Sequence, residues 1–170
     1  SDDGDDPVDS PTVEYSYGAN GKVAEEHDHR YVQKRMLAYD MSERLCQEKE
    51  ISEFGPTAYQ VNYGYDKYGN LVRLSERIFG SPSPYITNYT YDNDNRPTAI
   101  QYGADTRKIE YTYDELGRID SKTTRNGTLT RGTSYNYVAG NPALANATTP
   151  LVSSITQYGM DFSYTYDNVG

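Results

Sequence analysis

Residues 111–119 read Tyr-Thr-Tyr-Asp-Glu-Leu-Gly-Arg-Ile, and versions of this phrase recur along the whole chain. Strong versions begin at Tyr63, Tyr89 and Tyr164. Weaker versions have their second tyrosine at positions 17, 39 and 137. Neighbouring copies lie 22 to 29 residues apart, and a near-fixed period in this range is typical of one supersecondary unit copied many times. The spacing predicts seven copies, from Tyr15 to the end of the chain.

Each copy has the pattern of a β-hairpin. Tyr111 and Tyr113 alternate with polar residues, which is typical of a strand with one buried face. Asp114 then begins a turn, where a short carboxylate can accept backbone N–H groups. Gly117 stands where a three-residue hairpin loop needs a left-handed residue. Residues 118–123 read as the returning strand.

The same positions can be marked in the sister copies, and we expect them to be structural. Glu43 occupies the glycine position of one weak copy, so a different turn is expected there. The expected turn residues are Asp40, Asp66, Gly69, Asp92, Asn95, Asp114, Gly117 and Asp167. The expected tyrosine stripe consists of Tyr63, Tyr65, Tyr89, Tyr91, Tyr111, Tyr113, Tyr164 and Tyr166.

The fold class predicted from these hairpins is all-β. Asn20-Gly21 and Asn126-Gly127 are further turn signals, expected at the opposite ends of the strands. The copies give an antiparallel meander of about 12–14 short strands, and so large a sheet tends to curl or close. We therefore expect a barrel-like or strongly curved sheet. Residues 23–54 fit either a helix or strands, and the phase of the repeat favours strands.

The composition limits the function. The net charge is −9, and five aspartates lie in the first nine residues. This acidic balance argues against a nucleic-acid partner. Residues 1–12 have little to bury and are expected to be disordered, whereas 13–170 form one repeat domain. The last copy lacks its second half, which predicts truncation at the C-terminus. No apolar run is long enough for a transmembrane helix, and Cys46, the only cysteine, is expected to be inert.

The phrase resembles the YD repeat, also called the Rhs repeat, across most of the chain. Residues 111–119 match its Tyr-x-Tyr-Asp-x-x-Gly-Arg-hydrophobic pattern throughout, while Asn70 and Asn95 depart from it in sister copies. The resemblance implies hairpins wound into a shell or barrel. The acidic start also resembles that of short bacterial surface lipoproteins of unknown function with a porin-like fold. That likeness implies a lipid anchor before Ser1 and a place in the bacterial outer membrane or cell envelope.

Candidate chemistry is sparse, so we expect no enzyme and no cofactor. His27 and His29 would share a strand face, where Glu25 could join them as a metal ligand. Such a pair is more often a solvated face, so no metal is expected. Tyr68 is a candidate for an exposed contact, and residues 138–150 interrupt the repeat. The sequence predicts a non-enzymatic, lipid-anchored surface scaffold that binds a glycan or a protein. The alternative is a fragment of a larger encapsulating YD-repeat shell.

Overall fold

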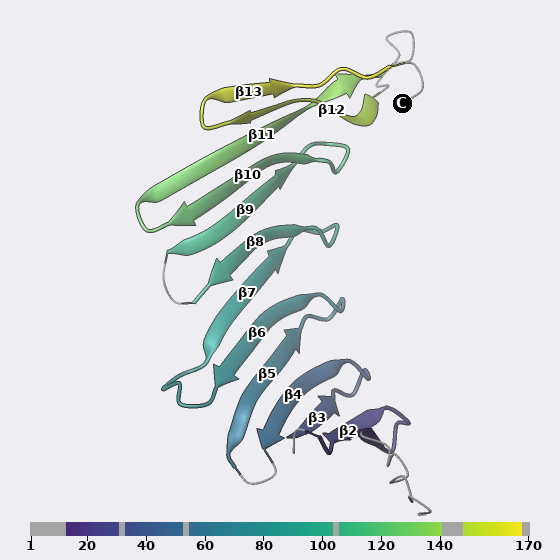
Figure 1. Cartoon of the computed structure of the whole chain (residues 1–170). Coiled ribbons are helices and arrows are strands. Elements are labelled where there is room, and N and C mark those ends of the chain that lie inside the picture. The colour runs from purple at the N-terminus through teal and green to yellow at the C-terminus, as the bar shows by residue number, and fades with distance from the viewer. Residues whose placement is uncertain (1–12, 31–32, 53–54, 104–105, 141–147, 168–170) are drawn as a thin grey trace, which may run out of the picture. The chain divides into compact units, whose positions relative to one another are not determined.

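The computed structural model describes residues 13–30, 33–52, 55–103, 106–140 and 148–167. They form a single sheet of thirteen strands, in which the strand order follows the chain order (Figure 1). The strands are β1 (Val13–Tyr17), β2 (Val23–Asp28), β3 (Gln33–Tyr39), β4 (Leu45–Ser52), β5 (Thr57–Tyr65), β6 (Leu71–Ile78), β7 (Tyr85–Tyr91), β8 (Pro97–Tyr102), β9 (Arg107–Tyr113), β10 (Ile119–Asn126), β11 (Leu129–Ala139), β12 (Thr148–Gln157) and β13 (Met160–Ser163). The predicted antiparallel meander is confirmed. The strands β2–β4 rule out the helical alternative for the described residues of 23–54.

The sheet is open, because β1 and β13 lie at opposite ends of the strand order and do not pair. Of the two forms expected, the barrel-like sheet is therefore wrong for the described strands. The chain divides into two compact units, residues 1–86 and 87–170. The acidic leader 1–12, residues 141–147 of the interrupting segment, and 168–170 of the last copy lie outside the described residues. No described segment forms a helix with the length and hydropathy of a membrane span.

One turn geometry recurs in five described hairpins, at the turns 18–22, 40–44, 66–70, 92–96 and 114–118. The N–H of Asp114 donates to the carbonyl of Arg118, and the N–H of Gly117 donates back to the carbonyl of Asp114. Gly117 has a φ of 80°, the left-handed conformation that glycine adopts at little cost. Asn95 takes the corresponding place in its copy with a φ of 61°. The expected hairpin loop with a left-handed third residue is therefore present.

Two turn expectations were wrong. Glu43 adopts a φ of 60°, and the turn around it has the same backbone hydrogen bonds as its sisters. The geometry of the repeat thus overrides the tendency of glutamate to avoid the left-handed conformation. Asn20 and Gly21 do not lie at the opposite strand ends, because the turn between Gly18 and Lys22 has the same bonding pattern. This turn belongs to the first copy of the series.

A β-bulge accompanies the second tyrosine of the copies. The pairing register shifts beside Tyr39, Tyr65 and Tyr91, and again beside Tyr17 and Tyr137. In these pairs the extra residue lies in the returning strand, such as Cys46 opposite Tyr39 and Val72 opposite Tyr65. A bulge bends the strand that carries it, so the returning strand bends close to the turn.

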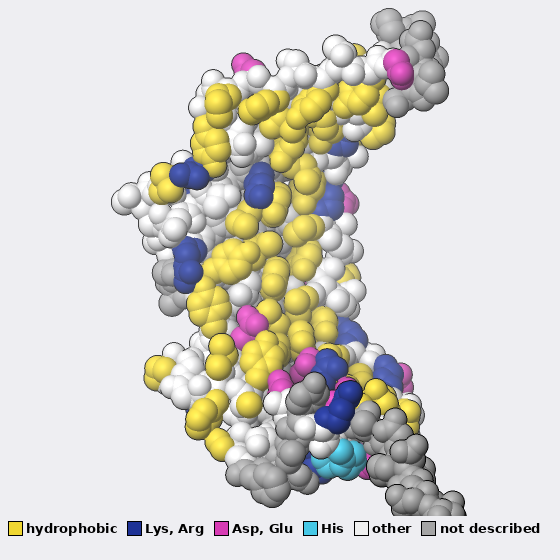
Figure 2. Space-filling model, in the orientation of Figure 1, with side chains coloured by type: hydrophobic (Ala, Val, Ile, Leu, Met, Phe, Trp, Pro, Cys, Tyr) yellow, Lys and Arg dark blue, Asp and Glu magenta, His cyan; other side chains and the backbone are white. Residues whose placement is uncertain are grey.

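The described sheet is one layer thick and has almost no buried core. Val61, Ala99 and Thr87 are the buried residues among those described. In each unit one face carries the apolar strand positions, and we call it the tyrosine face. It includes Tyr59, Val61, Tyr63, Leu74 and Ile78 in the first unit and Tyr89, Ile100, Ile109, Tyr111, Tyr135, Ile155 and Phe162 in the second. Figure 2 shows apolar side chains gathered on the viewed surface of both units.

The strained turn at Glu43 gives a direct test of this geometry. Glu43→Gly should raise the free energy of unfolding by about 0.5–1 kcal/mol. A left-handed backbone conformation costs a non-glycine residue roughly 1–2 kcal/mol. The larger conformational entropy that glycine loses on folding offsets part of the gain from removing this strain. Denaturant titration measures the change. Glu43→Ala keeps the backbone strain and removes the carboxylate, so it should not raise the free energy of unfolding. A destabilised glycine variant would contradict the assigned turn.

Candidate functional site

The repeated residues of the phrase form a contact between consecutive hairpins, which we call the rim clasp. It consists of the turn aspartate, the residue four positions later, and the second tyrosine of the following copy. In the clasp of Asp114, Arg118 and Tyr137, the arginine Nε lies 2.7 Å from Asp114 Oδ2. Its guanidinium carbon lies 4.1 Å from the centroid of the Tyr137 ring. One arginine therefore joins a carboxylate of its own copy to an aromatic ring of the next.

The clasp recurs in both units. Arg44 donates from Nε to Asp40 Oδ2 at 2.8 Å and lies 4.5 Å from the Tyr65 ring centroid. Arg96 donates to Asp92 at 2.7 Å and lies 4.6 Å from the Tyr113 ring. Stacking of a guanidinium on an aromatic face is favourable because of the ring's quadrupole. The recurrence makes the clasp a property of the repeat.

Two copies use other residues in the arginine position. Asn70 donates its side-chain amide to Asp66 Oδ2 at 3.0 Å. Lys22, which follows a glycine in place of the aspartate, lies 5.2 Å above the Tyr39 ring and donates to the carbonyl of Glu43. Asn70 thus keeps the contact to the turn aspartate, and Lys22 keeps the contact to the tyrosine ring. Arginine combines both contacts, because its planar fork binds the carboxylate while its face stacks on the ring.

The tyrosine hydroxyl completes the clasp by binding the backbone of the preceding copy. Tyr113 Oη donates to the carbonyl of Pro97 at 2.7 Å, and Tyr137 Oη donates to that of Ile119 at 2.7 Å. Corresponding bonds join Tyr39 to Val23 at 3.1 Å, Tyr65 to Leu45 at 2.9 Å and Tyr166 to Val152 at 2.8 Å. Each hydroxyl thus binds a backbone carbonyl, and in Tyr65, Tyr113 and Tyr137 this bond holds the ring under a guanidinium.

Position 117 requires glycine for a second reason, besides its positive φ. A Cβ built there would lie 2.8 Å from Nη1 of Arg96 in the preceding copy. A side chain at this position would displace the arginine that stacks on Tyr113. The glycine of the phrase thus leaves room for the clasp of the neighbouring hairpin.

Hydrogen bonds to the turn carboxylates lower their pKa values. Bonds from the backbone and then the side chain of Arg96 lower the pKa of Asp92, and those of Arg44 do the same for Asp40. For Asp114, partial burial would raise the pKa, but bonds from Arg118 and Leu116 outweigh it and the net shift is downward. These carboxylates are stabilised as anions and are poor candidates for proton transfer.

The structure places the predicted residues within this architecture. Six of the eight stripe tyrosines lie in β5, β7 and β9, whereas Tyr164 and Tyr166 follow β13. Asp167 is described, but the turn expected after it lies outside the described residues. Cys46 is half-buried in β4, and Tyr68 is 68% exposed. The arginines of the clasp were missed, although their fixed spacing of four residues after aspartate could have revealed them.

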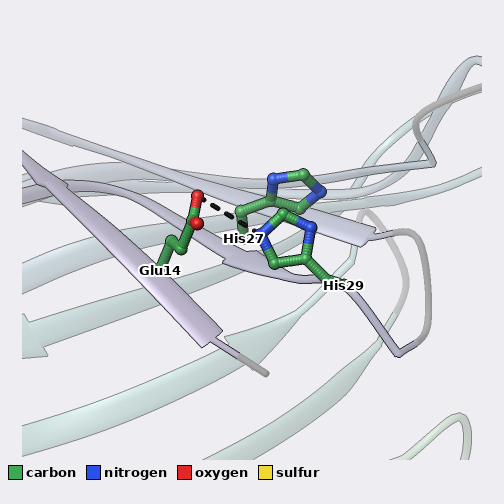
Figure 3. Close-up of side chains that lie close together, drawn as sticks. All are labelled: Glu14, His27 and His29. Carbon is green, nitrogen blue, oxygen red and sulfur yellow. Dashed lines mark ion pairs between the residues drawn. The ribbon is translucent and has the colours of Figure 1, made fainter. Parts of the chain in front are cut away.

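A separate cluster of metal-ligating side chains lies in the first hairpin. One donor atom each from Glu14 of β1, His27 of β2 and His29 of the turn after β2 lie within 4.8 Å of one another (Figure 3). His29 Nε2 is 3.2 Å from Glu14 Oε2, and the two imidazole centroids are 4.0 Å apart. Two imidazoles and a carboxylate are donors that Zn²⁺ binds in proteins.

This cluster differs from the one that the sequence suggested. Glu25 does not join the histidines, because its carboxylate lies 3.0 Å from Lys34 Nζ. Glu14 takes its place, since β1 pairs with β2 so that Glu14 stands directly opposite His27. Counting back from the turn at Gly18–Lys22 would have found this pair. His27 Nε2 is buried and has no hydrogen-bond partner among the described residues, which costs roughly 1–3 kcal/mol for a buried polar group.

Comparisons with known proteins add little to this geometry. No family model matches the chain, and no curated protein matches it. A crystal structure of TcdB2-TccC3 without its hypervariable C-terminal region is similar over 92% of this chain, with 14% sequence identity and a TM-score of 0.48. The match covers 10% of that longer chain.

The clasp carboxylates predict how stability depends on pH. Their pKa values are lowered by folding, so their contribution is present above the unfolded aspartate value of about 3.9 and is lost as pH falls through the native values. Urea unfolding should show a free energy that is level between about pH 7 and 5 and falls below about pH 4.

Asp114→Asn should be less stable than the parent at pH 7, and the difference should narrow in acid, because the variant lacks the charge that acid removes. Glu115→Gln removes a charge from the same turn outside the clasp and serves as the control. A difference between Asp114→Asn and the parent that stays constant from pH 7 to 3 would show that the charge of Asp114 does not stabilise the fold.

Proposed function

We propose that this chain is a non-enzymatic structural scaffold, a run of YD-type hairpins that builds the wall of a larger repeat sheet. The observation that carries this proposal is the rim clasp. It joins consecutive hairpins in both units through an aspartate, an arginine and a tyrosine. These are residue types that an active site would otherwise need. In repeat proteins the stability is approximately a sum of repeat and nearest-neighbour terms, and the clasp supplies such a neighbour term.

The tyrosine face supports a role in covering or enclosing a protein. Phe162, Tyr164 and Ile78 are 46%, 45% and 64% exposed, and no second layer covers this face within the described part of the chain. Tyrosine is enriched at protein interfaces because its ring packs while its hydroxyl remains polar. We therefore propose a polypeptide as the partner of this face.

An in-phase duplication tests whether the clasp builds an extendable wall. A second copy of residues 92–113 inserted after Tyr113 preserves the phrase and adds one hairpin with one clasp. We expect the melting temperature to rise by about 2–4 °C for each kcal/mol gained by the added neighbour contact. Calorimetry measures the shift.

The matched control carries the same insertion with alanine in place of the inserted Asp92 and Arg96. This control adds the same length of chain without the clasp, so its melting temperature should rise little or not at all. Equal gains in both insertions would assign the stabilisation to strand pairing alone. A loss in both would reject the wall as an extendable structure.

A second candidate is a surface scaffold with a lipid anchor before Ser1 that presents rim residues to a glycan. The exposed ring of Tyr68, with Lys67 Nζ 4.7 Å from its centroid, favours this alternative. A glycan array would support it if a signal is lost in Tyr68→Ala and kept in Met41→Ala, an exposed turn residue of the preceding copy. An array without signal would reject glycan binding.

A further inference from the structure

We propose that Glu14, His27 and His29 form a zinc site that fastens the edge strand β1 to β2. The site lies outside the rim clasps and is independent of the scaffold function proposed above. It is assembled by local chain geometry, because the β1–β2 register places Glu14 opposite His27 and the following turn returns His29 to the same place. Figure 3 shows the three side chains turned toward one another.

The donor geometry is close to what the ion requires. Zinc bonds to nitrogen and carboxylate oxygen are about 2.0–2.2 Å long, so tetrahedral donors lie about 3.3–3.6 Å apart. Glu14 Oε2 and His29 Nε2 already lie 3.2 Å apart. The donor atoms of the cluster all lie within 4.8 Å of one another, and rotation of the exposed Glu14 and His29 side chains can bring them closer. Glu14 and His29 are 62% and 45% exposed, which leaves a route for the ion and a fourth position for water.

The state of His27 provides an independent reason for a ligand. Its Nε2 is buried without a hydrogen-bond partner in the described part of the chain, whereas most buried polar atoms in proteins have one. No bond at this nitrogen opposes rotation of the ring toward an ion. A metal bound to the imidazole would compensate a polar group that the fold leaves unsatisfied.

The neighbouring charges do not block a cation. Lys34 lies opposite His27 on β3, but its ammonium is paired with Glu25 at 3.0 Å. Arg30 is paired with Asp28 at 3.2 Å. The carboxylate of Glu14 therefore remains available to offset part of the charge of the ion.

The consequence concerns the end of the sheet. β1 pairs with β2 alone among the described strands, and an edge strand exposes unpaired backbone groups that promote mispairing. An ion held by β1, β2 and the turn after β2 would fix the β1 register. Zinc acts here as a structural clip, as in sites where metal binding contributes directly to folding.

Calorimetric titration of the tag-free, metal-stripped chain with ZnCl₂ tests the site. We expect one zinc ion per chain, and Glu14→Gln or His29→Ala should each weaken binding at least about tenfold, or about 1.4 kcal/mol. Glu26→Gln alters the opposite face of β2 and should bind as the parent does. Circular dichroism of the metal-free variants should match that of the parent, since both substituted side chains are exposed.

Hydrogen exchange distinguishes a structural zinc site that stabilises β1 from adventitious zinc binding by the two histidines. Zinc should slow exchange of the β1 amides in the parent and leave them unchanged in His29→Ala. Absence of binding in the parent would overturn the proposal. Binding by Glu14→Gln with parental affinity, or binding without protection of β1, would overturn it equally, because either result describes adventitious binding by the imidazoles.

Discussion

The rest of the structure depends on the contact of an arginine with an aspartate of its own hairpin and a tyrosine of the next. A sheet one layer thick has no packed interior to specify how its hairpins align. Backbone pairing holds neighbouring strands, but sheets with weakly specified faces are prone to slip in register. The clasp resists a slip, because moving a hairpin by one residue would take Tyr137 away from Arg118 and from the carbonyl of Ile119.

The clasp also explains why the phrase has its particular residues. Asp114 accepts hydrogen bonds from the backbone N–H groups of Leu116 and Arg118, which shape the turn, and from the side chain of Arg118. Gly117 permits the left-handed turn and leaves space for Arg96. The bulge of the returning strand lies opposite the second tyrosine. These residues together maintain the hairpin structure, so they are poor candidates for catalytic residues. The cluster at Glu14, His27 and His29 lies outside this set of residues.

Much of the fold follows from local signals in the sequence. Period-two alternation in 109–113 predicted a strand, and the Asp-x-x-Gly spacing predicted the turn. Closure could not be derived, because local hairpin signals do not determine whether the first and last strands meet. The Glu43 turn was misjudged since neighbouring copies impose a conformation that glutamate alone disfavours. Arg118 was overlooked because its partner Tyr137 belongs to the next copy, and Glu14 because it meets His27 only through the β1–β2 register.

A double-mutant cycle on Arg118 and Tyr137 tests this account most directly. Arg118→Met keeps most of the aliphatic stem and Tyr137→Leu keeps an apolar side chain, so the cycle isolates their interaction from simple loss of burial. Urea unfolding of the parent, both single variants and the double variant gives the coupling energy. The clasp predicts a favourable coupling of about 0.5–2 kcal/mol. A coupling of zero, with both single variants as stable as the parent, would contradict the claim that the clasp holds the hairpins in register.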